Sequence, residues 1–232
     1  MSLTSFLRYN PDVRERFRIE CPKPIFSIRK PLLAPPLSKR YALIGTAFDY
    51  LFRFYLERLN KVQTNKPWIA ELAVIKSIHM KQFYKKGIEI INQARKDKAN
   101  YLKTGKVHKK LITSVLLLAQ LDPIYRVGIG YEYVGRIRPK DIKDIRRLIG
   151  IVNPRLFKAK KICLVNPTFG KASKLVEGAD ADIVIDDMLI DIKTTKLLEL
   201  PGKTFQQLIG YYICIRSAAP CRPFVSSLTF SS

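Results

Sequence analysis

The stretch that decides the fold lies at residues 181–194 and reads Ala181-Asp-Ile-Val-Ile-Asp-Asp-Met-Leu-Ile-Asp-Ile-Lys-Thr194. Aliphatic and β-branched residues fill both halves of this stretch, which is typical of β-strands. The acidic pair Asp186-Asp187 stands between the halves, where a turn is expected. We therefore predict a β-hairpin with strands at about 181–186 and 189–194.

The register of this hairpin decides which charged side chains meet. With a two-residue loop at 186–187, Asp182 lies opposite Asp191; with the loop at 187–188, Asp182 lies opposite Lys193. Side chains alternate between the two faces of a strand, so both registers place the two carboxylates and the ammonium on one face.

Six of the 19 acidic residues fall between positions 177 and 191. They are Glu177, Asp180, Asp182, Asp186, Asp187 and Asp191. Crowded carboxylates repel one another unless cations balance them, and a bound divalent metal does this well. Two carboxylates and an ammonium on one face suit metal-assisted phosphodiester hydrolysis, in which the carboxylates hold Mg²⁺ or Mn²⁺ and Lys193 positions water or offsets charge. An exposed hairpin with acidic decoration is the alternative.

A helix is predicted after the hairpin. Thr204 is a suitable N-cap, and the residues from Phe205 to Ile215 have helical periodicity. Gln207 and Tyr211 are four residues apart, so they share one face of this helix. We interpret this pair as part of the site, and the alternative is that Tyr211 is a core aromatic residue.

These elements together resemble the PD-(D/E)XK nuclease superfamily, specifically its RecB-like and CRISPR-associated exonuclease branch. That branch shares a Gly-x-x-Asp strand, a strand with (Asp/Glu)-x-Lys and a helix with Gln-x-x-x-Tyr. The similar segments here are Gly178-Ala-Asp-Ala-Asp182, Asp191-Ile-Lys193 and Gln207-Leu-Ile-Gly-Tyr211, in the same order. The resemblance implies an α/β, restriction-endonuclease-like core with a mixed central sheet flanked by helices. It also implies a Mg²⁺- or Mn²⁺-dependent deoxyribonuclease with five catalytic residues, Asp182, Asp191, Lys193, Gln207 and Tyr211.

A third metal ligand is suggested by the same resemblance. The first core helix of that branch often begins with Gly and carries a metal-binding His. The similar segment Gly45-Thr-Ala-Phe-Asp49 has Asp at that position, and Asp is a competent ligand for hard metals. Asp49 therefore joins Asp182 and Asp191 as a predicted metal ligand, and the alternative is a first-turn acid favoured by the helix dipole. The four-cysteine pattern of some relatives is absent, so no iron–sulfur cluster is expected.

The remaining segments predict the domain organisation. Six prolines within residues 1–40 predict an extended arm. Residues 41–215 are expected to form the nuclease-like domain, with a first helix at 44–60, a strand near 160–166 and an α-helical insert at about 67–121. The Ser- and Pro-rich tail at 216–232 is predicted to be disordered.

The charge of the chain points to a polyanionic partner. Its 232 residues include 42 Lys and Arg against 19 Asp and Glu, which gives a net charge of +23. Such a chain repels itself unless it meets a polyanion, so nucleic acid is the first candidate partner and an anionic membrane surface the second. The region 136–174 is especially cationic, and a solvated helical face is the alternative to a phosphate-contacting surface. The predicted nucleic-acid-binding residues are Arg136, Arg138, Lys140, Lys143, Arg146, Arg147, Lys158, Lys160 and Lys161.

Membrane and secretory assignments are disfavoured. The longest apolar run, Leu111 to Leu121, is interrupted by polar residues and is too short to span a bilayer. The N-terminus lacks the pattern of a signal peptide, and the four cysteines form no CxxC pair, which favours reduced cysteines in a cytoplasmic protein.

The sequence therefore predicts a metal-dependent DNA nuclease that hydrolyses phosphodiester bonds. Its alternatives are a catalytically silent basic nucleic-acid-binding protein with the same fold and a basic scaffold that binds RNA, which needs no carboxylate cluster. The sequence does not decide between single- and double-stranded DNA or define an oligomeric state.

Overall fold

The computed structural model describes residues 3–25, 32–127, 134–176, 178–195, 199–218, 224–225 and 228–231. Within these ranges the chain is a mixture of α-helices and short β-strands, so the predicted α/β class is confirmed. The chain divides into two compact units. Residues 33–157 form what we call the helical unit, and residues 1–32 with 158–231 form the sheet unit. The predicted domain at 41–215 spans parts of both.

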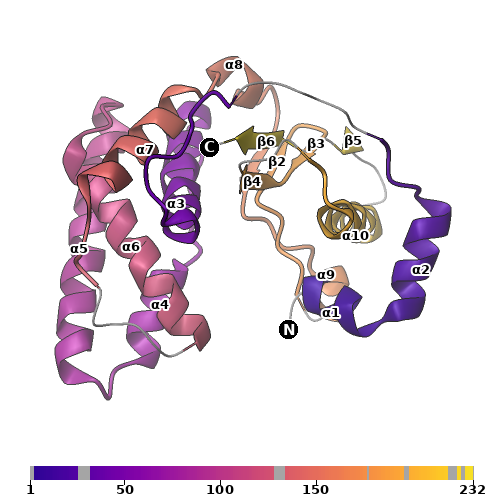
Figure 1. Ribbon diagram of the computed structural model, residues 1–232, viewed down its shortest axis with the longest axis horizontal. Helices are drawn as coiled ribbons and strands as arrows, with labels where there is room; N and C mark the ends of the chain where they lie inside the picture. Colours follow the sequence, from indigo (N-terminus) through magenta and orange to yellow (C-terminus); the bar gives the residue numbers. More distant parts are fainter. Residues whose placement is uncertain are drawn as a thin grey trace. The chain divides into compact units, whose positions relative to one another are not determined.

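The sheet unit contains all the strands of the described chain, shown in Figure 1. Its main sheet has the order β1-β2-β3-β5, formed by β1 (Cys163–Val165), β2 (Ile183–Ile185), β3 (Met188–Ile190) and β5 (Phe224–Val225). Strand β2 is antiparallel to both β1 and β3, whereas β5 runs parallel to β3. A second sheet consists of the parallel strands β4 (Ile192–Thr195) and β6 (Leu228–Ser231).

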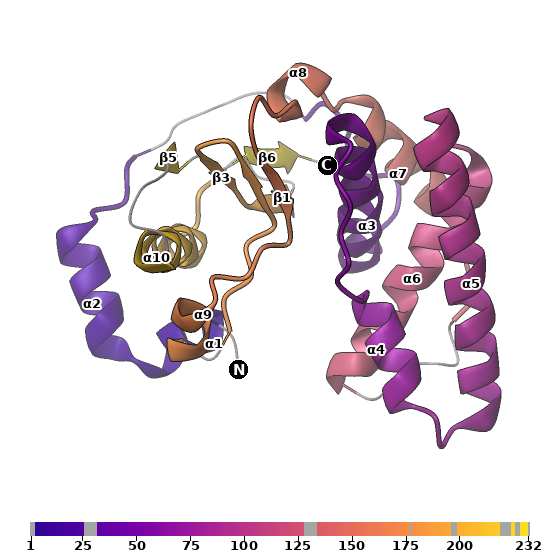
Figure 2. The same ribbon diagram turned by 180° about the vertical axis from the view of Figure 1, so that it is seen from behind.

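The helices of the sheet unit are α1 (Leu3–Tyr9), α2 (Pro11–Glu20), α9 (Lys171–Leu175) and α10 (Gly202–Ala218). A buried cluster joins α1, α9 and α10 to the sheet, and α10 lies beside the strands in both Figure 1 and Figure 2. Val184 and Leu189 are its sheet members, and Leu208 and Tyr211 contribute from α10. The sheet face that carries Val184 and Leu189 is therefore the face that α10 covers.

The first forty residues correct one prediction, because residues 3–9 and 11–20 form helices instead of an extended arm. Pro11 stands in the first turn of α2, where its fixed φ is suited to a helix and its missing N–H costs no hydrogen bond. The prolines of this segment predicted an extended backbone, but Pro11 begins a helix.

The tail also differs from its predicted disorder. Helix α10 continues to Ala218, and the described residues at 224–225 and 228–231 are strands β5 and β6. The rest of the segment 219–232 lies outside the described residues.

The helical unit consists of α3 (Tyr41–Asn60), α4 (Ile69–Lys76), α5 (Lys81–Thr104), α6 (Lys109–Val127), α7 (Pro139–Gly150) and α8 (Pro154–Phe157). Helix α6 packs against α3, α4, α5 and α7, and its fully buried residues include Ile112, Leu116, Leu118 and Leu121. The predicted helical insert corresponds to α4, α5 and the greater part of α6. No helix in the described part of the chain is long and apolar enough to cross a membrane.

Candidate functional site

The hairpin of β2 and β3 places Asp182 opposite Asp191. Ile183 pairs with Ile190 and Ile185 pairs with Met188, so the loop consists of Asp186 and Asp187. Continuing this register by one position brings Asp182 and Asp191 together. The first of the two predicted registers is therefore the one that forms.

Alternation along the strands places both carboxylates on the side of the sheet that α10 covers, and the charges of both raise the pKa of Tyr211 on that helix. Asp182 is two residues before Val184, and Asp191 is two residues after Leu189, so each shares the face of its buried neighbour. The charged pair thus lies at the end of an apolar layer, next to a helix. This placement explains why Asp191 is only 3% exposed.

Asp191 occupies the junction between the two sheets. Strand β3 ends at Ile190 and pairs with β2 and β5, whereas β4 begins at Ile192 and pairs with β6. The backbone N–H of Ile192 donates a 2.7 Å hydrogen bond to Oδ2 of Asp182. This bond ties the carboxylate of one strand to the next element and fixes where the two acids meet.

Lys193 completes the group predicted from the sequence. Its Nζ lies 2.7 Å from Oδ2 of Asp191, and its side chain is 37% exposed. In the described part of the chain no other donor is bonded to this oxygen. An ionised carboxylate has about four acceptor positions, so Asp182 and Asp191 retain acceptor capacity beyond these contacts.

Burial raises the pKa of Asp191 to about 6. The nearby negative charge of Asp182 acts in the same direction, and the ammonium of Lys193 acts against it. A further cation that approaches Asp191 would lower this pKa, because a nearby positive charge stabilises the ionised carboxylate.

Gln207 and Tyr211 lie together on α10, as their spacing predicted. Gln207 Nε2 donates a 2.7 Å hydrogen bond to Tyr211 Oη. Burial raises the pKa of Tyr211, and the charges of Asp191, Asp182 and Asp180 raise it further. The phenol therefore lies within electrostatic reach of the carboxylates, although it also belongs to the buried cluster.

The other acids of the stretch have separate surroundings. Asp186, at a φ of 52°, accepts hydrogen bonds from the backbone N–H groups of Lys160, Lys161 and Ile162 at 2.7–3.0 Å. These bonds lower its pKa and hold the approach to β1 against the turn, so its role is structural. Asp187 is exposed, and Glu177 lies outside the described residues.

Asp180 is a residue that the sequence reasoning did not select. Its charge acts on Tyr211 together with those of the two site carboxylates. The signal was available, because Asp180 and Asp182 are two residues apart and so share a face in an extended segment. The spacing before Asp182 also differs from the family pattern, because Gly178 stands four residues before it, one more than in Gly-x-x-Asp.

The donor set at Asp182 and Asp191 fits Mg²⁺ or Mn²⁺. Mg²⁺ usually binds through one or two carboxylates, keeps several waters and takes oxygens from a substrate phosphate. Two adjacent carboxylates with spare acceptor positions meet this requirement. The described residues contain no cluster of three or more His, Cys, Asp or Glu side chains that could form an all-protein cage.

Asp49, the third predicted ligand, belongs to the helical unit. It forms an ion pair with Arg53 at 2.7 Å, one turn further along α3. Because α3 begins at Tyr41, Asp49 lies well past the first turn, and the alternative of a first-turn acid is wrong. Its role as a metal ligand stays a prediction.

The predicted nucleic-acid-binding residues are divided between the units. In the helical unit, α7 and the residues before it carry six of them, of which five are exposed and Arg147 is half-buried. They are Arg136, Arg138, Lys140, Lys143, Arg146 and Arg147. The two acids of α7 point inward: Asp144 accepts hydrogen bonds from the backbone N–H groups of Leu37 and Ser38, and Asp141 from Ser38 Oγ. All the charged side chains on the outer face of α7 are therefore cationic. Lys158, Lys160 and Lys161 are exposed in the sheet unit.

Comparison of the chain with protein-family models, curated proteins and solved structures finds no match. Function must therefore be inferred from the arrangement of the side chains.

Proposed function

We propose that the chain is a metal-dependent deoxyribonuclease that hydrolyses phosphodiester bonds at the Asp182–Asp191 pair. The observation that carries this proposal is the hairpin register, which sets the two carboxylates opposite each other with Lys193 2.7 Å from Asp191. A purely decorative acidic hairpin would not need a carboxylate that is 97% buried beside a second one, since burying charge in this way costs stability.

Asp182 and Asp191 would hold Mg²⁺ or Mn²⁺ through their spare oxygens. When bound, such an ion lowers the pKa of water and stabilises charge on the attacked phosphate. Lys193 supplies a positive group beside the reacting phosphate and helps to orient the attacking water. Its partial exposure leaves the ammonium accessible to substrate.

Gln207 and Tyr211 act as positioning residues in this proposal. Their mutual hydrogen bond fixes the rotamers of both side chains on the face of α10 that meets the sheet. From there they hold the strand that carries Asp191 and Lys193, or contact a substrate phosphate.

The order of elements in the sheet unit supports a restriction-endonuclease-like core. Three antiparallel strands, β1 to β3, are followed by β4 of the second sheet and by α10, and β5 then pairs with β3 in the main sheet. In the nuclease family the helix with Gln-x-x-x-Tyr is usually followed by a further strand, so the position of β5 agrees with the proposal.

DNA is the proposed substrate because the net charge of +23 and the exposed lysines and arginines favour a polyphosphate. The direct experiment incubates the purified chain with linear duplex, closed circular duplex and single-stranded DNA in Mg²⁺ or Mn²⁺, with EDTA controls. We expect cleavage that needs the metal, and the pattern of substrates cut identifies strandedness and any requirement for ends. Tight binding without cleavage of any substrate would instead identify a catalytically silent nucleic-acid-binding protein.

A further inference from the structure

The helical unit carries most of the positive charge of the chain. Residues 33–157 contain 25 Lys and Arg against 9 Asp and Glu, which gives +16 of the total +23. Many of these acids are engaged internally: Asp141 and Asp144 are buried, Glu57 pairs with Lys98, and Asp122 accepts a hydrogen bond from Tyr50. The surface of this unit is therefore more cationic than its composition alone indicates.

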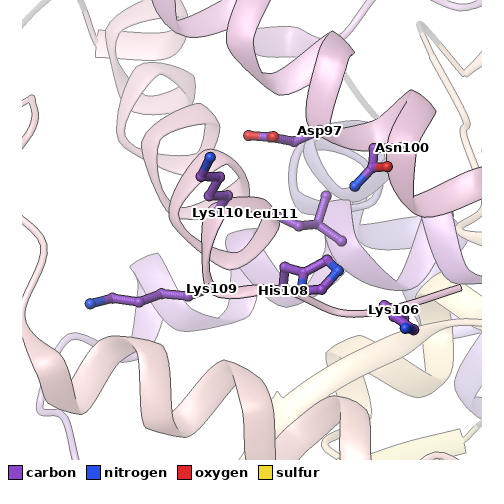
Figure 3. A pocket seen from close by; sticks show the side chains of 7 residues that line it. All are labelled: Asp97, Asn100, Lys106, His108, Lys109, Lys110 and Leu111. Atoms are coloured by element: carbon purple, nitrogen blue, oxygen red, sulfur yellow. The ribbon is translucent and has the colours of Figure 1, made fainter. Parts of the chain in front are cut away.

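A hollow of about 420 Å³ opens on this unit between the end of α5 and the start of α6. Figure 3 shows its lining, with two residues from α5, two from the connection and three from α6. These residues are Asp97, Asn100, Lys106, His108, Lys109, Lys110 and Leu111. The imidazole of His108 lies beside Leu111 near the centre of the group, whereas Lys109 extends away from the others.

The charges around the hollow favour an anion. Its lining includes three lysines and a histidine but a single acid, Asp97. Oδ2 of Asp97 already accepts hydrogen bonds from Ser114 Oγ at 2.7 Å and from Gln93 Nε2 at 3.1 Å, and Ser114 is only 2% exposed. The Asp97 carboxylate thus connects α5 to α6 through these hydrogen bonds. The lining of the hollow contains no other acidic residue to balance the lysines.

The start of α6 adds backbone donors to the same place. The first bond of this helix runs from Ile112 N–H to the carbonyl of His108. The N–H groups of Lys109, Lys110 and Leu111 precede this bond and have no partner inside the helix. Free N–H groups at the start of a 19-residue helix attract anions, and here they coincide with a hollow and with basic side chains.

We infer that the α5–α6 hollow is a phosphate-binding site and that its ligand is a backbone phosphate of bound nucleic acid. Long lysine side chains can close over a phosphate as point charges, and the amide of Asn100 supplies a further donor at the rim. The inference shares with the proposed function only the expectation of a polyanionic partner. It does not require the carboxylate site to cut DNA.

The two histidines of the chain provide a direct test by proton NMR. His108 lines the hollow, whereas His79 is exposed in the turn between α4 and α5 and serves as an internal control. The full chain is titrated in EDTA with a 12-nucleotide single strand and, separately, with inorganic phosphate; a His79→Gln variant assigns the ring signals. We expect saturable shifts of the His108 ring protons with DNA and little change for His79. Shifts with phosphate that DNA cannot displace would overturn nucleic acid as the source, and an unresponsive His108 would overturn the site.

A charge-matched pair of variants tests the lysines. Lys106→Gln/Lys110→Gln changes the hollow, and Lys81→Gln/Lys85→Gln removes the same charge at the far end of α5. We expect the first variant to bind DNA roughly 3–10-fold more weakly at moderate salt, and its slope of log affinity against log salt to be smaller by about 1–2. The loss of binding free energy in the second variant should be less than about half of the loss in the first. Equal losses in both variants would show that the hollow contributes only general charge, which contradicts the inference. Binding is measured in EDTA, so the result stands whether or not the chain proves to be a nuclease.

Discussion

Asp186 and Asp191 are five residues apart in one acidic stretch, yet they meet opposite environments. Three backbone N–H groups lower the pKa of Asp186, whereas burial beside Asp182 raises that of Asp191 to about 6. Alternation along the strands predicted which acids share a face. It could not predict the role of Asp186, because its partners at residues 160–162 come from a distant segment.

The pair on α10 gives a prediction at the residue scale. Tyr211→Phe removes the acceptor of the Gln207 amide and should lower kcat of DNA cleavage roughly tenfold or more, because the positioned side chains beside the carboxylates lose their fixed geometry. The free energy of unfolding should fall by only about 1 kcal/mol, the usual net value of one hydrogen bond. Steady-state cleavage and urea unfolding measure the two effects. Tyr212→Phe, at the next position, is the control, and equal kcat values for both variants would leave the Gln207–Tyr211 pair as packing alone.

At the scale of elements, periodicity predicted the hairpin, the helix at α3 and the helices of the insert, because each has a continuous apolar pattern. The division of the second hairpin strand into β3 and β4 was not predictable in this way. It depends on β5 and β6, which come from the tail and pair with different halves of the strand. A Ser- and Pro-rich composition gave no sign of those strands.

Two glycines provide a matched test of helix packing. A Cβ at Gly87 in α5 would overlap Cγ2 of Val74 in α4, whereas a Cβ at Gly150 in α7 meets nothing within 4 Å. Gly87→Ala should lower the free energy of unfolding by roughly 1–3 kcal/mol despite the better helix propensity of Ala. Gly150→Ala should raise it by up to about 1 kcal/mol. Urea unfolding gives the free energy of unfolding of both variants relative to wild type. A Gly87→Ala protein that is more stable than wild type would contradict the close packing of α4 on α5.

Helix α6 contributes a pH dependence through Asp122, whose pKa is raised to about 6, first by burial. Because the folded state holds this proton more tightly than the unfolded state, the contribution is complete below about pH 4 and is lost as pH rises through about 6. Asp122→Asn keeps an acceptor for Tyr50 and removes the titrating group. In metal-free buffer, its free energy of unfolding relative to wild type should increase by roughly 1–3 kcal/mol between pH 4 and pH 7. A difference that stays constant over this range would contradict the raised pKa.

On the scale of the whole molecule, most of the net positive charge belongs to one unit and the carboxylate pair belongs to the other. The helical unit carries +16, and the sheet unit carries the proposed catalytic group. Composition predicted the polyanionic partner, but it could not show that the acids of α7 are buried and that its outer face is cationic. That distinction depends on Asp141 and Asp144 binding the segment at residues 37–40.

DNA binding should therefore be strongly dependent on salt and nearly independent of sequence. Each phosphate contact releases counterions, so a surface that makes several contacts gives a steep fall of log affinity against log salt. Fluorescence anisotropy with two unrelated duplexes of equal length, from about 50 to 200 mM salt, should show a loss of at least roughly a hundredfold for both. A flat salt dependence would indicate that phosphate contacts do not drive binding.

The most direct measurement for the carboxylate site is single-turnover cleavage of prebound DNA by Asp191→Asn and its control Asp187→Asn. Both variants remove one negative charge from the same hairpin, but only the first changes the pair with Asp182. We predict that wild type and Asp187→Asn cleave in Mg²⁺ at rates within about threefold of each other, that Asp191→Asn is at least roughly a hundredfold slower, and that all three bind DNA equally well in EDTA. Cleavage by Asp191→Asn at the rate of Asp187→Asn, or no cleavage by wild type in Mg²⁺ or Mn²⁺, would contradict the assignment of this pair as the catalytic site.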